Sequence, residues 1–258
     1  MLRILAITSL ALALAACSPM RQVQVQPRQT AMDDVALRAG ELRIADSALA
    51  SGDFEVAISL YQRITAAHPT AADAWLGLGA AHYLSGDLSQ AREAYERAIE
   101  VNADLLDAHL GLARMDIRQR RLEAAVGRYQ SLLARWPDHP LVLAGLGVSY
   151  DLMGQPAEAQ ETYKKGLRVH PDDPALRSNL GLSLALNDKP REAVNVLLDV
   201  MGVPTGLPQG RQNLALAYAI MGREDAAESI LLGDMPRETV QDNLAFYRYV
   251  RARLSRAH

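Results

Sequence analysis

A 34-residue period is the feature that most constrains how this chain of 258 residues can fold. The unit is clearest in residues 72–105, where apolar residues recur every three or four positions on both sides of Ser85-Gly86-Asp87. This spacing predicts two amphipathic helices joined by a tight turn, because residues three and four apart share one helix face. Gly86 can adopt the positive φ that ends the first helix, and Asp87 can cap the second.

The same register continues through the chain without insertions. The predicted units are residues 38–71, 72–105, 106–139, 140–173, 174–207 and 208–241. Position 20 is alanine in every unit and position 8 is glycine or alanine, so two antiparallel helices can approach closely where they cross. Position 24 is large, and its residues are Tyr61, Tyr95, Tyr129, Tyr163, Leu197 and Leu231. The alternation of small and large positions predicts helical hairpins that pack on one another.

These motifs resemble the tetratricopeptide repeat family. The match includes the W-x-x-L-G start of the second unit (Trp75, Leu78, Gly79), the alanine at position 20 and a proline near the end of several units. The resemblance implies an all-α fold, a right-handed superhelical solenoid of about six helix-turn-helix repeats. Residues 242–258 are predicted to form a helix that caps the last unit, with a basic docking helix as the alternative.

The N-terminus has the features of an export signal. Arg3 precedes an apolar run of 13 residues, Ile4 to Ala16, which is shorter than the roughly 20 residues that a membrane-spanning helix needs. The run ends in Leu14-Ala15-Ala16-Cys17, which resembles a bacterial lipobox, and Cys17 is the only cysteine of the chain. We therefore predict removal of residues 1–16 and lipidation of Cys17, which gives enough acyl chain for stable membrane attachment.

The residues that follow the cysteine predict where the protein is anchored. By resemblance to lipoprotein sorting in diderm bacteria, Ser18 rather than Asp after the cysteine indicates the outer membrane, with the protein on its periplasmic face. Residues 17–37 are rich in glutamine and include Pro27. This composition predicts a flexible tether between the lipidated cysteine and the repeats.

No catalytic arrangement is visible in the sequence. The formal net charge of −3 provides no electrostatic footprint for nucleic acid. His82 and His109 lie on first helices of neighbouring units, but no third metal ligand converges on them. Gly77 and Gly79 lack a third glycine and a preceding strand, so they form no nucleotide loop. We predict a protein that is not an enzyme, with no cofactor, metal, nucleic acid or small-molecule substrate.

Protein binding is the function that the family resemblance implies. In this family the first helices line a concave groove, chiefly at positions 5, 9 and 12. The corresponding residues here are Leu76, Ala80, Tyr83, Leu110, Arg114, Ile117, Ala144, Val148, Asp151 and Leu182. The lining is mainly apolar, which suits a bound helix or extended segment with an apolar stripe. The family's carboxylate-clamp version needs several basic residues and asparagines, and only Arg114 qualifies. The alternative is that some of these residues are buried between units.

The C-terminal part resembles a narrower group. Within Arg211–Arg251, the pieces RQNLALAYA, MGR and DNLAFYRYVR are similar to the TadD family, lipoproteins of tight-adherence (Flp-type) pilus assembly systems. The resemblance implies a role in assembling an envelope-spanning pilus machine, with a secretin or another assembly subunit as the protein partner. The alternatives are a type IV pilus pilotin-like lipoprotein and a periplasmic adaptor for peptidoglycan hydrolases or proteases.

Overall fold

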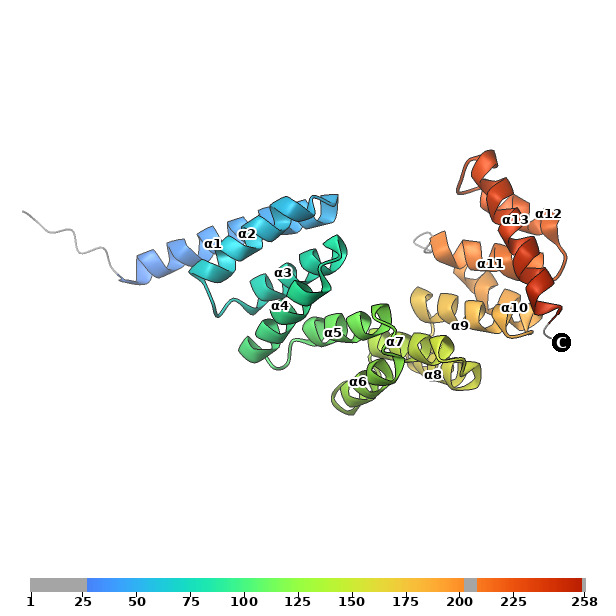
Figure 1. The fold of residues 1–258 in the computed structure, drawn as a ribbon, viewed down its shortest axis with the longest axis horizontal. Coiled ribbons are helices and arrows are strands. Elements are labelled where there is room, and N and C mark those ends of the chain that lie inside the picture. Colours follow the sequence, from blue (N-terminus) through green and yellow to red (C-terminus); the bar gives the residue numbers. More distant parts are fainter. Residues whose placement is uncertain (1–26, 202–207, 257–258) are drawn as a thin grey trace, which may run out of the picture.

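The chain folds into a row of antiparallel helical hairpins (Figure 1). The computed structural model describes residues 27–201 and 208–256, and all regular structure within these ranges is helical. The 13 helices are α1 Pro27–Ser51, α2 Phe54–Ala67, α3 Ala72–Ser85, α4 Leu88–Val101, α5 Leu106–Arg118, α6 Leu122–Arg135, α7 Pro140–Leu152, α8 Pro156–Val169, α9 Pro174–Leu186, α10 Pro190–Met201, α11 Pro208–Ile220, α12 Glu224–Leu232 and α13 Arg237–Leu254. The predicted all-α class is confirmed.

The hairpins stack in the order of the sequence. Each odd-numbered helix up to α11 packs against the even-numbered helix that follows it, and the first helices of successive hairpins also contact each other. Figure 1 shows an elongated, curved row with α1 and α13 at opposite ends. This is the paired helix-turn-helix packing of tetratricopeptide repeats, as the 34-residue period predicts.

One backbone conformation recurs at position 15 of every unit, in the turn between the two helices. All six residues there have positive φ, from 58° to 96°. The left-handed conformation ends the first helix and reverses the chain, and it favours glycine because a Cβ atom is strained there. Four units have glycine, but the third and fifth do not: the six residues are Gly52, Gly86, Arg120, Gly154, Asp188 and Gly222.

Tyrosine at position 24 packs directly against glycine backbone. The ring of Tyr95 lies between Gly79 of its own unit and Gly111 of the next, and a Cβ atom added at either glycine lies 2.6 Å from a ring atom. The same approach joins Tyr61 to Gly77 and Tyr129 to Gly145. The repeat pattern predicts the small residue at position 8, and the glycine at position 6 of the second, third and fourth units completes the contact.

Both ends of the solenoid differ from the predicted boundaries. Helix α1 begins at Pro27 and not at residue 38. Residues 27–37, which are the second half of the predicted tether 17–37, are therefore helical. Proline is favoured in the first turn of a helix, and no breaker interrupts the stretch from there to the first unit. Cys17, the signal peptide and residues 17–26 lie outside the described residues. In the two described ranges, no helix is long and apolar enough to cross a membrane.

The C-terminal helix begins earlier than predicted. Helix α12 has only 9 residues, and α13 starts at Arg237 instead of residue 242. Gly233 and Pro236 lie between them, and the extended ψ of 150° at Pro236 sets the start of α13. The new helix packs against α11 and α12, with Val240, Leu244 and Tyr247 buried. It covers the last hairpin, as a capping helix does.

The contact between glycine and tyrosine predicts a matched pair of substitutions. Gly111→Ala places a methyl group 2.6 Å from the Tyr95 ring, so we expect it to lower the free energy of unfolding by about 1–3 kcal/mol. Gly127→Ala on α6 meets nothing within 4 Å and should raise it by about 0.5–1 kcal/mol, the usual gain in a helix interior. Urea unfolding measures both, and equal effects would contradict the packing described.

Candidate functional site

The ten residues predicted to line the groove divide by burial. Leu110 is 1% exposed and Ala144 is 9% exposed, and both belong to the core between units. The prediction is wrong for these two, because the neighbouring hairpin covers position 5 in the third and fourth units. Arg114 is exposed. The other predicted residues are partly exposed: Leu76, Ala80, Tyr83, Ile117, Val148, Asp151 and Leu182.

A cavity of about 330 Å³ lies between the first helices α7 and α9. Val148, Asp151 and Leu182 from the predicted set meet there, and Tyr163 of α8 contributes to the wall. The cavity also has residues that were not predicted, namely Leu152, Asn179, Ser183, Leu186 and Asn187. Those on α9 recur at intervals of three and four, so they share one helix face. This spacing is visible in the sequence and could have identified these α9 residues as part of the cavity.

Asp151 supplies the polar group of this cavity. The hydroxyl of Ser183 donates a hydrogen bond to Oδ1 at 2.7 Å, and the hydroxyl of Tyr163 donates to Oδ2 at 3.0 Å. Burial raises the pKa of Asp151 above its usual range, although these two hydrogen bonds act in the opposite direction. Burial, together with the nearby Asp151 charge, also raises the pKa of Tyr163 far above its usual range, so its hydroxyl remains a donor.

The Asp151 carboxylate can accept further hydrogen bonds. Each of its oxygens accepts one bond from the protein, while a carboxylate oxygen has room for two. Among the described residues, no arginine, lysine or histidine forms an ion pair with it. A half-buried negative charge in a mainly apolar cavity is complementary to a basic or N–H group beside an aliphatic side chain.

The groove carries the opposite charge near α3 and α5. The Arg118 guanidinium lies 4.9 Å from the centre of the Tyr83 ring and donates a hydrogen bond to the Tyr83 carbonyl at 2.5 Å. The charge of Arg114 affects the pKa values of two buried tyrosines. Burial raises the pKa of Tyr95 and of Tyr129 to about 12, and the positive charge of Arg114 opposes that rise. The groove is therefore positive at α3 and α5 and negative at α7 and α9.

The groups in this groove are suited to binding a ligand. In the part of the chain that the structure describes, no three His, Cys, Asp or Glu side chains form a group that could hold a metal ion. His109 bonds to the Ala103 carbonyl instead, with Nε2 at 3.0 Å. His82 is buried in α3. The groove presents apolar side chains, hydroxyls, amides and isolated charges, which are groups that recognise a peptide segment.

The family assignment follows from this fold and groove. Models of the tetratricopeptide repeat match residues 42–105, 85–140 and 116–181, which together span more than half of the chain. The chain therefore belongs to the tetratricopeptide repeat family, whose members are scaffolds for protein binding and are typically not catalytic. No curated protein matches the sequence.

Several solved structures share the fold. PilF of Pseudomonas aeruginosa matches with a TM-score of 0.60 and 20% identity, over 76% of this chain and 89% of that one. The tetratricopeptide repeat protein TTC0263 of Thermus thermophilus matches with a TM-score of 0.60 and 24% identity, over 69% and 98%. A structure of MamA matches with a TM-score of 0.50 and 23% identity, over 63% and 88%. These likenesses show the repeat fold.

The raised pKa of Asp151 predicts an unusual effect of neutralising it. A carboxyl whose pKa is higher in the folded state than its ordinary value of about 3.9 costs stability as pH rises through that interval. We therefore expect Asp151→Asn to unfold at the same or a higher urea concentration than wild type at pH 7, with the difference shrinking in acid. Tyr163→Phe should raise the Asp151 pKa further, which carbon NMR of the carboxyl group measures. An Asp151→Asn variant that becomes less stable than wild type as pH rises would contradict this electrostatic description.

Proposed function

We propose that this protein is a non-enzymatic lipoprotein at the periplasmic face of the outer membrane that binds a protein partner through its groove. We further propose that it supports assembly of a tight-adherence (Flp-type) pilus machine by localising the secretin. The observation that carries the binding role is the cavity between α7 and α9, in which Asp151 keeps acceptor capacity beside apolar side chains.

The distribution of charge along the groove supports a segment bound in one direction. Asp151 attracts a basic or N–H group at the α7 and α9 end, while Arg114 and Arg118 favour an acidic group at the α3 and α5 end. Leu182 and Val148 offer apolar surface to an aliphatic side chain beside Asp151 in the same cavity. Complementary charges set the register of a bound segment, and the apolar contacts add affinity.

The N-terminal motifs support the membrane anchor. Lipidation of Cys17 holds the chain at the bilayer, and the residues before Pro27 connect the acyl chains to α1. When the protein and its partner are both held at one membrane, the effective concentration of each near the other rises. In this mechanism the solenoid presents the groove and the lipid determines where the partner accumulates.

The sequence of Arg211–Arg251 supports the tight-adherence assignment through its resemblance to the TadD family. PilF, a type IV pilus assembly lipoprotein, shares the fold, so a pilotin-like role in a type IV pilus system is the alternative within the same class. An adaptor for periplasmic hydrolases or proteases is the alternative outside pilus assembly. Loss of surface pili without a change in cell shape distinguishes the pilus roles from the adaptor.

Deletion of the gene tests the role in pilus assembly. We expect secretin multimers to disappear from the outer membrane and surface pili to be lost, because the secretin is no longer collected at the membrane. A Cys17→Ala variant should leave a soluble chain that fails to restore either. Fractionation with secretin immunoblotting measures both results. Normal multimers in the deletion strain would refute the role, and full rescue by Cys17→Ala would refute the anchoring step.

A photo-cross-linking residue placed in the groove tests the binding site. At Val148, which lines the cavity, it should capture the secretin, whereas at the exposed Glu161 of α8 it should not. Adding Asp151→Asn to the Val148 probe should weaken capture by about tenfold, the effect of losing one charged hydrogen bond. Equal capture from both positions would exclude the groove as the binding site.

A further inference from the structure

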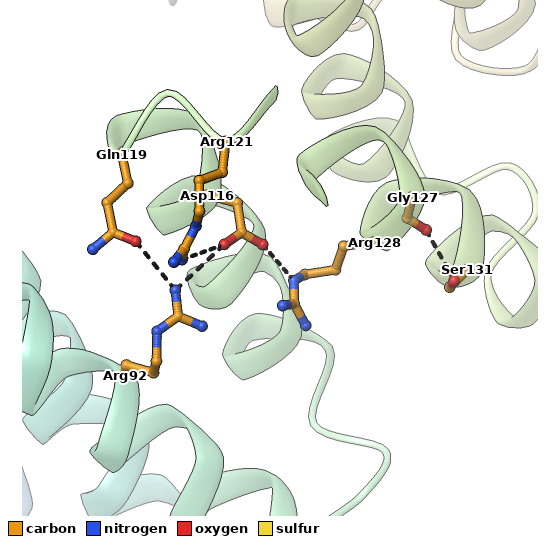
Figure 2. Close-up of polar contacts among 7 residues, drawn as sticks. All are labelled: Arg92, Asp116, Gln119, Arg121, Gly127, Arg128 and Ser131. Atoms are coloured by element: carbon orange, nitrogen blue, oxygen red, sulfur yellow. Dashed lines mark hydrogen bonds and ion pairs between the residues drawn. The ribbon is translucent and has the colours of Figure 1, made fainter. Parts of the chain in front are cut away.

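Three arginines surround one buried carboxylate at the turn between α5 and α6 (Figure 2). The side chain of Asp116 is only 2% exposed. Arg121 donates from Nη2 to Oδ1 at 2.7 Å, Arg128 donates from Nε to Oδ2 at 2.9 Å, and Arg92 donates from Nη2 to Oδ1 at 3.3 Å. The arginines come from α4, from the turn itself and from α6, so the carboxylate ties the second unit to the third.

This cluster keeps an excess of positive charge. Burial by itself raises the pKa of Asp116, but hydrogen bonds from Arg128 and Arg121 outweigh it and hold the pKa below its usual range. The carboxylate therefore stays charged and neutralises only one of the three guanidiniums. Each guanidinium bonds to it through one nitrogen, and the other nitrogens have no hydrogen-bond partner in the described ranges. The side chains of Arg92, Arg121 and Arg128 are 27%, 48% and 33% exposed.

The backbone of the same turn holds a further arginine in a strained conformation. Arg120 has φ of 58° at position 15, where four of the six units have glycine. A non-glycine residue in the left-handed region is destabilising, and such strain concentrates where a side chain has a function. Arg120 is exposed next to Arg121. The turn thus adds a positive charge where the repeat favours a residue without a side chain.

We propose that the arginine cluster, defined as Arg92, Arg120, Arg121 and Arg128, binds clustered carboxylates of an acidic segment in a protein partner. The guanidinium is a planar fork that matches a carboxylate, and three of these forks are already arranged around one. Their remaining donors can hold further carboxylates at the surface. This cluster shares no residue with the groove described above, and the proposal does not depend on the proposed pilus function.

The surrounding charges favour a peptide over a lipid surface. Two acidic residues are exposed on the same helices as the arginines: Asp87 at the start of α4 and Glu123 in the first turn of α6. They would repel a continuous anionic bilayer. A flexible segment can place its carboxylates between them. A flexible acidic segment therefore fits this surface.

Fluorescence anisotropy of a labelled Asp- and Glu-rich peptide with the full mature chain tests the proposal. Arg120→Gly and Arg120→Asn both remove the charge and both tolerate positive φ. We expect each to weaken peptide binding by about threefold, the usual worth of one exposed charge contact, with melting temperatures equal to or above wild type. Binding should also fall steeply with added salt, since exposed charges are screened.

Asp188→Gly is the matched control, because Asp188 occupies position 15 of the fifth unit with φ of 60°. It should leave peptide binding unchanged. The proposal is overturned if the Arg120 variants bind as tightly as wild type, if Asp188→Gly weakens binding equally, or if a peptide with Asn and Gln in place of Asp and Glu binds as well. Binding of phosphatidylglycerol vesicles that depends on Arg120, without peptide binding, would replace the peptide with a membrane surface and also overturn it.

Discussion

The close approach of an aromatic ring to glycine backbone is the contact on which the solenoid depends. Tyr95 fits between Gly79 and Gly111 because neither glycine has a Cβ atom, and the contact repeats along the row. Such a tyrosine packs against the next hairpin, so stability is shared between neighbouring hairpins. This repeating contact changes at the fifth unit, where position 6 is Asn179 instead of the glycine of the second to fourth units. The largely apolar cavity that contains Asp151 is located at this change.

The fold was predictable because a 34-residue period defines both the hairpin and the way hairpins stack. The ends were less predictable, since helix continuation from Pro27 and the early start of α13 depend on local breakers. Groove positions on the first helices were also inferred, but the pattern does not show how far a neighbouring unit covers position 5, so Leu110 and Ala144 were misplaced. The Asp116 cluster could not be inferred, because it joins side chains from three helices.

Two carboxylates, the buried Asp116 and the partly buried Asp151, have opposite properties in the same scaffold. Asp116 is surrounded by arginines that lower its pKa, so its charge stabilises the packing of two units. Asp151 has only two hydroxyl partners, and burial raises its pKa. A charge that costs stability is characteristic of residues maintained for binding. The contrast separates a structural carboxylate from one available to a ligand, and it agrees with a groove that recognises a basic or N–H group.

Hydrogen exchange of the protein, with and without the secretin that we propose as its partner, tests the groove most directly. Partner binding to the concave face should slow exchange of amides in α7 and α9, while the second helices α8 and α10 keep their rates. We expect this protection to be confined to those first helices and to be weaker in the Asp151→Asn variant. Protection on α8 and α10 instead, or none anywhere at saturating secretin, would contradict the claim that this protein acts through its groove.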